Sequence, residues 1–171
     1  MTDLTRIFGD AGPLASAIAG FRPRDQQLEM AQRVATAIAG NGVLVTEAGT
    51  GTGKTFAYLV PAMLSGAKVI VSTGTRTLQD QLFQRDLPTV RDALHLPVTV
   101  ALLKGRQNYV CHYRLERAQA DGRFASREDV AHLHAIARFA RETGSGDKAG
   151  CTSVPESSPV WIAATSTREN C

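Results

Sequence analysis

The sequence predicts an α/β fold in which helices cover both faces of a mostly parallel sheet. Three short apolar runs, at residues 42–46, 68–73 and 98–103, support this prediction, because strands buried on both faces are continuously apolar. Helical patterns separate the runs, and this alternation favours βαβ crossovers. Beyond Lys104 the sequence becomes helical, polar and arginine-rich. We therefore expect one domain at 1–104 and a second at 105–171.

Helices in the first domain are predicted from apolar spacing and from their end signals. Residues 23–39 carry an apolar stripe on one helical face, and Gly40 follows as a stop. A second helix should follow the glycine-rich loop and bend or end around Pro61. Residues 76–87 predict a third helix between the second and third apolar runs.

The second domain contains one strong helix signal. Ser126 and Asp129 have the spacing of a capping box, which should open a helix to about Arg141. Residues 144–159 are rich in Gly, Ser and Pro and predict a long surface loop. Trp161 follows that loop, and packing is favoured over nucleic-acid stacking. The expected buried face of the helix comprises Val130, Leu133, Ala137 and Ala140.

Composition excludes several classes of protein. The 171 residues suit one core with an appendage, and the net charge of +3 permits nucleic-acid contact without requiring it. Three cysteines are too few for a secreted disulfide scaffold, so free thiols or metal ligands in a reducing cytoplasm are expected. No apolar run reaches the roughly 20 residues of a membrane span, and the N-terminal residues lack a signal peptide's basic start. We expect a cytoplasmic protein with its own N-terminus and no membrane partner.

The stretch AGTGTGKT at residues 48–55 has Walker A spacing, with an apolar run before it and a helix after it. Backbone N–H groups in such a loop converge on a polyphosphate, and three glycines allow close approach and positive φ. Lys54 would contact the β and γ phosphates, and Thr55 would ligate Mg²⁺, so these two are the candidate catalytic residues. The alternative is a glycine-rich turn with no ligand. The candidate loop residues are Ala48, Gly49, Thr50, Gly51, Thr52, Gly53, Lys54 and Thr55.

Hydrolysis needs an additional acidic motif at a strand end. The stretch DVAH at residues 129–132 resembles a DEAH box, but it has Val130 in the glutamate position and lies in the predicted capped helix. We interpret this match as coincidence. The chain is therefore expected to lack Walker B and the hydrolytic half of an ATPase.

The glycine loop, the glutamine stretch FRPRDQQ upstream and STGTRTLQDQL downstream together resemble the XPD/DinG-like iron–sulfur helicases of superfamily 2, most closely the DinG/YoaA branch. The resemblance runs from about Phe21 to Cys171 and implies an N-terminal fragment. It implies a P-loop NTPase (RecA-like) motor domain followed by the start of a helical iron–sulfur insertion. By this resemblance Arg24 and Gln27 contact adenine, which makes ATP the nucleotide. A polar residue on a helix face is the alternative for Gln27.

The resemblance also implies DNA contacts. VSTGTRTLQDQL is similar to motif Ia, so Thr73, Thr75 and Gln79 would touch the backbone of single-stranded DNA. Simple capping, with a box opened by Thr77, is compatible with that role. Lys104 and Arg106 would steer DNA, a solvated basic turn being the alternative.

Two cysteines are implied as ligands of a 4Fe-4S cluster. LKGRQNYVCHYRL resembles the segment with the first cluster cysteine, Cys111, and STRENC the segment with the second, Cys171. A cluster takes four thiolates, and the other two would lie beyond this sequence. A small buried residue is the alternative for Cys111, and Cys151 matches no family segment. His132 and His134 lie two apart on a helix, which argues against a metal pair.

The implied function is an ATP-dependent DNA helicase of 5′ to 3′ polarity in DNA repair or replication, acting on single-stranded DNA or a forked duplex. Protein partners stay unknown. The chain alone should bind nucleotide weakly and unwind nothing. Two other functions stay open: a stand-alone P-loop nucleotide-binding protein or kinase, and a non-enzymatic redox-sensing DNA-binding module.

Overall fold

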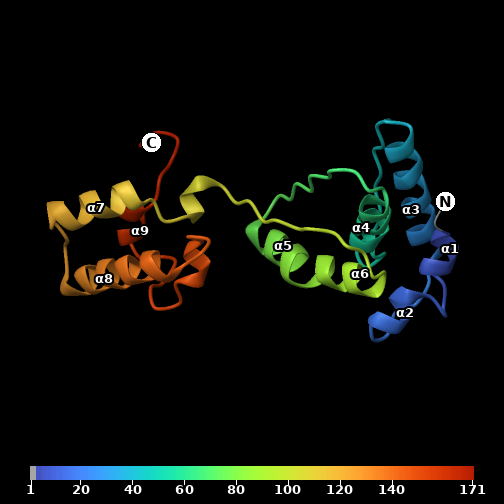
Figure 1. Ribbon diagram of the computed structural model, residues 1–171, viewed down its shortest axis with the longest axis horizontal. Coiled ribbons are helices and arrows are strands. Elements are labelled where there is room, and N and C mark those ends of the chain that lie inside the picture. Colours follow the sequence, from blue (N-terminus) through green and yellow to red (C-terminus); the bar gives the residue numbers. More distant parts are fainter. Residues whose placement is uncertain (1–2) are drawn as a thin grey trace. The chain divides into compact units, whose positions relative to one another are not determined.

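The computed structural model describes residues 3–171, which form two compact units. One unit ends at Leu102, and the other runs from Leu103 to Cys171. Each unit is built from helices and has an apolar core of its own (Figure 1). Within the described range, no helix has both the length and the apolar character needed to cross a membrane.

The first unit packs its helices directly against one another. Helix α3 confirms the helix predicted at 23–39, with Gly40 as its C-cap. Helix α4 packs along α3, and α6 packs against α4. The elements are α1 (Leu4–Ile7), α2 (Pro13–Ala17), α3 (Asp25–Ala39), α4 (Lys54–Leu64), α5 (Arg76–Gln81), the π-helical turn η1 (Leu82–Asp86) and α6 (Leu87–Ala93).

Two predicted helices differ in detail from the structure. Helix α4 does not end at Pro61 but continues to Leu64, with the proline buried in its interior. The helix predicted at 76–87 is confirmed, but it is divided into α5, η1 and α6. Sequence pattern does not distinguish a π-helical turn from an α-helix, because both keep one apolar face toward the core.

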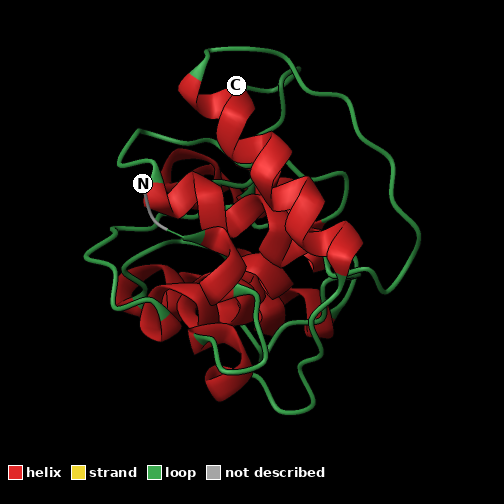
Figure 2. Cartoon of the chain, turned by 90° about the vertical axis from the view of Figure 1, so that its right-hand side faces the viewer, coloured by secondary structure: helices red, strands yellow, loops and turns green. Residues whose placement is uncertain are grey.

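The predicted parallel sheet is not present in the structure of the described residues. Residues 42–46, 68–73 and 98–103 are extended, but among residues 3–171 the only β-bridges join Tyr109 to Asp147 and Val110 to Thr165. Figure 2 accordingly shows helices connected by loops. The reason lies in the core of this unit, whose buried side chains come from the helices and the turns around them and not from the three extended runs.

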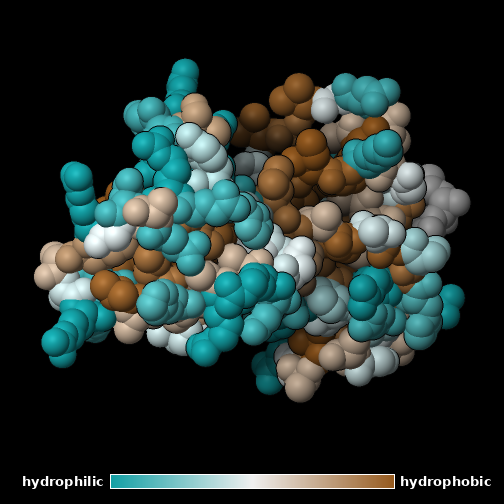
Figure 3. Space-filling view, turned by 60° about the vertical axis from the view of Figure 1, so that its left-hand side comes forward, coloured by the Kyte–Doolittle hydropathy of each residue, from teal (hydrophilic) through white to brown (hydrophobic). Residues whose placement is uncertain are grey.

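The extended runs leave large apolar side chains in solvent. Val43 is 95% exposed, Val45 92% and Ile70 95%. Figure 3 shows apolar side chains, in brown, gathered on the surface of the unit that contains the chain's beginning. Exposed apolar patches of this kind mark surfaces that interact with another segment, protein or ligand.

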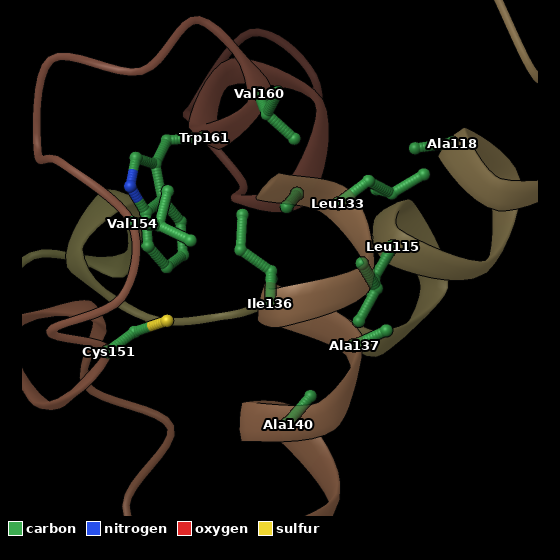
Figure 4. Close-up of a cluster of buried hydrophobic side chains, with 11 residues drawn as sticks. Leu115, Ala118, Leu133, Ile136, Ala137, Ala140, Cys151, Val154, Val160 and Trp161 are labelled. Carbon is green, nitrogen blue, oxygen red and sulfur yellow. The ribbon is translucent and has the colours of Figure 1, made fainter. Parts of the chain in front are cut away.

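The second unit has a core between three helices and a long loop (Figure 4). Ser126 caps α8 as predicted, since its Oγ accepts a hydrogen bond from the backbone of Asp129 at 3.1 Å. Leu133, Ala137 and Ala140 are buried as expected, whereas Val130 is 38% exposed. The elements are η2 (Arg106–Asn108), α7 (His112–Asp121), α8 (Arg127–Glu142), η3 (Lys148–Gly150) and α9 (Val160–Ala164).

The loop at 144–159 is part of this core. Cys151 and Val154 are buried from it, and Trp161 lies beside them in Figure 4. The indole Nε1 of Trp161 donates to the carbonyl of Pro155 at 3.1 Å, which satisfies its one polar group. The packing interpretation of Trp161 is therefore confirmed.

Candidate functional site

The loop at residues 48–55 connects an extended run to the N-terminus of α4. Gly51 and Gly53 have φ of 79° and 80°, a region that residues with a Cβ rarely occupy. A Cβ added at Gly53 would lie 2.0 Å from Nε2 of Gln27, so any larger residue has to displace that side chain. Positive φ is confirmed at these two glycines, and the same expectation is wrong for Gly49.

Lys54 folds back over the loop that precedes it. Its Nζ donates to the carbonyl oxygens of Ala48 and Gly49, both at 2.7 Å. Thr52 Oγ1 also donates to the Gly49 carbonyl, at 2.9 Å. These bonds hold the ammonium charge close to the loop backbone, from where it can meet an anionic oxygen.

The first turn of α4 provides backbone donors beside that lysine. The first hydrogen bond of the helix runs from the Ala57 N–H to the Gly53 carbonyl at 3.2 Å, so the N–H groups of Lys54, Thr55 and Phe56 precede the helical ladder. The positive end of the helix dipole lies at the same place. Together with the lysine, this turn forms an anion-binding arrangement.

Gln27 links α3 to the end of the glycine loop. Its side chain is only 4% exposed, and its Nε2 donates to the Gly53 carbonyl at 2.9 Å. Gln27 is thus a polar residue of a helix face that is turned toward the loop and not toward solvent. Arg24, the N-cap of α3, is exposed. The structure thus brings Gln27 into contact with the loop. Arg24, three residues earlier in the sequence, stays exposed at the surface.

One residue that the sequence pattern did not indicate, Tyr58, lies one turn after Thr55 on α4. Burial raises the pKa of the Tyr58 hydroxyl, the bond to Thr55 lowers it, and the carboxylate of Asp86 raises it further. Asp86 is buried in η1. In the sequence, Tyr58 is recognisable only by its position three residues after Thr55, which places both on one helical face. This spacing is too common in helices to indicate a functional residue.

The motif Ia candidates lie at the start of α5. Thr75 is the N-cap, and its side chain accepts from the backbone N–H of Leu78 at 3.2 Å. Thr73 Oγ1 donates to the Thr75 carbonyl at 3.2 Å, and Gln79 is half-buried in the first turn. A capping box opened by Thr77 is wrong, because the cap is Thr75. The hydroxyls therefore shape this helix start.

Lys104 and Arg106 lie at the beginning of the second unit. The ammonium of Lys104 pairs with Asp147 Oδ2 at 2.8 Å, and the two side chains are 4% and 18% exposed. Lys104 was expected to steer DNA, and the structure corrects this, since its charge neutralises a carboxylate inside the unit. Arg106 is exposed at the start of η2.

Cys111 occupies the N-cap position of α7 and is partly exposed. Burial raises the pKa of its thiol, but hydrogen bonds from Ser166 and from the backbone N–H groups of Arg114 and Tyr113, with the charge of Arg114, outweigh it and lower the pKa. The Cys111 N–H donates to the Ala164 carbonyl at 2.9 Å. This environment stabilises a thiolate, the form that binds metals.

The other two cysteines lie in different surroundings. Cys171 is exposed, and Cys151 is buried in the core of the second unit. Across residues 3–171 no three His, Cys, Asp or Glu side chains come together as a metal site. The alternative for Cys111, a buried small residue, does not fit its partial exposure.

The chain is similar to proteins of known function. The family model for DEAD/DEAH box helicases matches residues 27–136. The chain is 48% identical over 168 residues to the ATP-dependent DNA helicase YoaA of Haemophilus influenzae, which covers 98% of this chain and 26% of that protein. YoaA of Escherichia coli shows the same identity and coverage.

A second group of relatives is similar over a shorter range. The ATP-dependent helicase DinG of Mycobacterium tuberculosis is 52% identical over 104 residues, which covers 56% of this chain and 16% of that protein. The chain thus spans about a quarter of the length of the YoaA proteins it matches. The resemblance to the DinG and YoaA helicases is confirmed.

Proposed function

The chain belongs to the DEAD/DEAH box helicase family, and from that membership we propose that it supplies the ATP-binding part of an ATP-dependent DNA helicase. Residues 1–104 would form the first part of a RecA-like motor domain, and residues 105–171 the first part of an iron–sulfur domain. The proposed activity is unwinding with 5′ to 3′ polarity in DNA repair or replication. Membership in the family implies a P-loop NTPase fold.

We propose that the three extended runs become parallel strands when neighbouring strands are present. Val43, Val45 and Ile70 are almost fully exposed, and burying each would contribute roughly 1.5–3 kcal/mol. Strands covered on both faces have this composition. The exposed apolar surface is what supports this proposal.

The single observation that carries the nucleotide proposal is the contact between Gln27 and the loop. The buried amide of Gln27 bonds to the carbonyl of Gly53, immediately before Lys54. A glutamine of the expected adenine-contacting stretch thus adjoins the expected phosphate-binding loop. An ordinary glycine turn between a strand and a helix needs no such partner.

Lys54 and Thr55 are the proposed catalytic residues of this site. Lys54 would leave the carbonyls of Ala48 and Gly49 and bind phosphate oxygens, which are the stronger acceptors because they are charged. Thr55 would hold Mg²⁺ through its hydroxyl oxygen. When bound, Mg²⁺ neutralises negative charge that develops on the phosphates. The backbone N–H groups of the first turn of α4 would hold the remaining oxygens.

No residue of this chain is proposed to activate the attacking water. Asp129 lies in the first turn of α8, and its backbone and carboxylate both bond to Ser126. Val130 and His132 follow it on the same helix. These contacts support the interpretation of DVAH as part of a capped helix.

The proposed DNA contacts are Thr73, Thr75 and Gln79 at the start of α5, with exposed Arg106 in the second unit. Contacts of this kind would involve phosphate and sugar and would weaken with salt. Lys104 is left out of this set because its charge is already neutralised by Asp147.

Cys111 and Cys171 are the proposed 4Fe-4S ligands in this chain. The lowered pKa of Cys111 fits a thiolate ligand, and Cys171 is exposed. When bound, such a cluster holds four thiolates in one place and so fixes the chain segments that carry them. Cys111 and Cys171 would supply two of those four thiolates.

The nucleotide proposal is tested by replacing Lys54. We expect Lys54→Ala to weaken binding of a fluorescent ATP analogue with Mg²⁺ by about tenfold or more, since a hydrogen bond to a charged group contributes roughly 1.5–3 kcal/mol. Lys68→Ala is the matched control, because Lys68 is exposed and lies outside the loop. Equal affinity of wild type and Lys54→Ala, with circular dichroism showing both folded, would contradict the proposal.

A further inference from the structure

The first segment of the second unit, residues 103–110, is attached to the rest of that unit through polar groups. The Lys104 ammonium lies 2.8 Å from Asp147 Oδ2. The Val110 N–H donates to the carbonyl of the residue before Asp147, at 2.9 Å, and Tyr109 forms a β-bridge with Asp147. We call this segment the strap, and its contacts converge on Asp147.

The strap also has hydrogen bonds of its own. The Lys104 N–H donates to the Tyr109 hydroxyl oxygen at 2.9 Å. Asn108 Nδ2 donates to the Gly105 carbonyl at 3.0 Å. These bonds join one end of the strap to the other without involving the rest of the unit. The strap is therefore expected to move as one piece.

The strap adds little to the apolar core of the second unit. The buried side chains of that core come from α7, α8, α9 and the loop at 144–159. Val110, which also forms a β-bridge with Thr165, is partly buried against it. At the other end of the strap, Leu103 is 82% exposed. Detaching the strap therefore exposes little apolar surface, so little hydrophobic stabilisation is lost.

The surface that receives the strap is held in place by its own bonds. Asp147 Oδ1 accepts from the Ala149 N–H at 3.0 Å, and the Asp147 N–H donates to Ser145 Oγ at 3.2 Å. The Gly146 N–H donates to Thr143 Oγ1 at 3.1 Å. These bonds do not involve the strap. The receiving loop therefore keeps its shape when the strap leaves.

The ion pair between Lys104 and Asp147 favours separation of the strap as a whole. The two side chains are 4% and 18% exposed, so both charges have lost most of their water. Separation returns both charges to water, which offsets the lost attraction, whereas removing only one partner leaves the other charge without compensation. The released residues also regain backbone freedom. Detachment therefore costs less free energy than unfolding the apolar core.

We propose that the strap detaches from the second unit as one piece while the core of that unit stays folded, and that Asp147 is the residue that holds it closed. The strap begins directly after the first unit, which ends at Leu102. Once detached, residues 103–110 can extend to roughly 27 Å. The connection between the two units can thus lengthen without unfolding either core. This inference goes beyond the proposed function and does not depend on it.

Native-state hydrogen exchange, followed by NMR on the 15N-labelled 171-residue chain, tests this inference. The Val110 N–H loses its bond to the Gly146 carbonyl when the strap detaches. Corrected for intrinsic rates, it should exchange at least about tenfold faster than the slowest amides of α8, which report unfolding of the core. Its rate should also depend little on low concentrations of urea, because little surface is exposed. Exchange of Val110 as slow as that of the slowest α8 amides would overturn the proposal.

A core variant separates detachment from unfolding. Ile136, in α8, is fully buried, and Ile136→Val should speed exchange of the slowest α8 amides by roughly 2- to 10-fold. The Val110 rate should stay the same, because the core is folded both before and after the strap detaches. Acceleration of Val110 by the same factor as α8 would show that the strap opens only with the core, which contradicts the proposal.

Asp147→Asn tests the residue that holds the strap. It keeps the size of the side chain and an acceptor for Ala149 but removes the charge that faces Lys104, so Val110 should exchange about tenfold faster or more. Asp121→Asn is the matched control, because it removes an exposed carboxylate at the end of α7 and should leave the Val110 rate unchanged. An unchanged rate in Asp147→Asn, or equal rates in the two variants, would overturn the role of Asp147. If Asp147→Asn does not fold, the Ile136→Val comparison decides, since it leaves every contact of the strap in place.

Discussion

Replacing Gly53 by alanine should destabilise the first unit by about 3 kcal/mol, which is more than a left-handed glycine alone accounts for. Gly53 has φ of 80°, where alanine is disfavoured by roughly 1–2 kcal/mol. In addition, the new Cβ would lie 2.0 Å from Nε2 of Gln27. Gln27 must then move, which breaks its 2.9 Å bond to the Gly53 carbonyl. Leaving a buried amide without its partner costs about 1–3 kcal/mol.

Gly51 supplies the matched control for this substitution. Its φ of 79° is nearly the same, but an added Cβ would meet no atom within 4 Å. Gly51→Ala should therefore cost only the backbone contribution of roughly 1–2 kcal/mol. The difference between the two variants measures the displacement of Gln27.

Urea unfolding followed by circular dichroism is a suitable assay for both variants. The single tryptophan of the chain, Trp161, lies in the second unit, so its fluorescence transition should be the same in both variants and in the wild type. Gln27→Ala removes the side chain that the new Cβ would meet. In the Gln27→Ala protein, Gly53→Ala should therefore lower the free energy of unfolding by less, and the coupling energy between the two substitutions should be about 1 kcal/mol or more. Equal destabilisation by Gly53→Ala and Gly51→Ala would refute the reasoning.

Two further predictions concern the second unit. Lys104→Met should destabilise it by about 3 kcal/mol, because the half-buried Asp147 carboxylate loses the buried ammonium that lies 2.8 Å from it. Unfolding followed by Trp161 fluorescence measures this loss, and a value below about 1 kcal/mol would contradict the prediction. Alkylation of Cys111 by iodoacetamide, followed by mass spectrometry, should reach half its maximal rate at a pH below that of an unperturbed thiol, because its pKa is lowered. Ser166→Ala removes one bond to the thiolate and should raise that pH, whereas an unchanged profile would refute the assignment.

The lowered pKa of Cys111 also has a consequence for stability, whose sign follows from linkage. A thiol whose pKa is lower in the folded state than in the unfolded state stabilises the fold when it is deprotonated. That stabilisation is present above the unfolded pKa and is lost as the pH falls through the folded pKa. Ser166→Ala should reduce it.

The helices of this protein were predictable because their signals are local. The apolar stripe of residues 23–39, the stop at Gly40 and the box opened by Ser126 each lie within a few turns of the chain. The glycine loop is equally local, since its spacing and φ requirements involve consecutive residues. These elements are found in the structure with small shifts of their ends.

The sheet could not be settled in the same way, because a strand depends on partners far away in the sequence. The apolar character of residues 42–46, 68–73 and 98–103 shows that these runs tend to be buried, but in the described chain the helices bury one another instead. The apolar composition that predicted strands is also why large valine side chains are exposed when no strand partner covers them. A local apolar pattern shows that burial would be favourable, but only the packing of the whole fold determines whether the side chains are buried.

The sequence by itself determined the helicase family and the spacing of the glycine loop, because each is encoded in short motifs. Only the tertiary structure decided that Gln27 contacts Gly53 and that Lys104 is neutralised by Asp147. Both contacts connect residues more than 25 positions apart. Their energies arise from burial and from the neighbours that folding brings together, which no local spacing specifies.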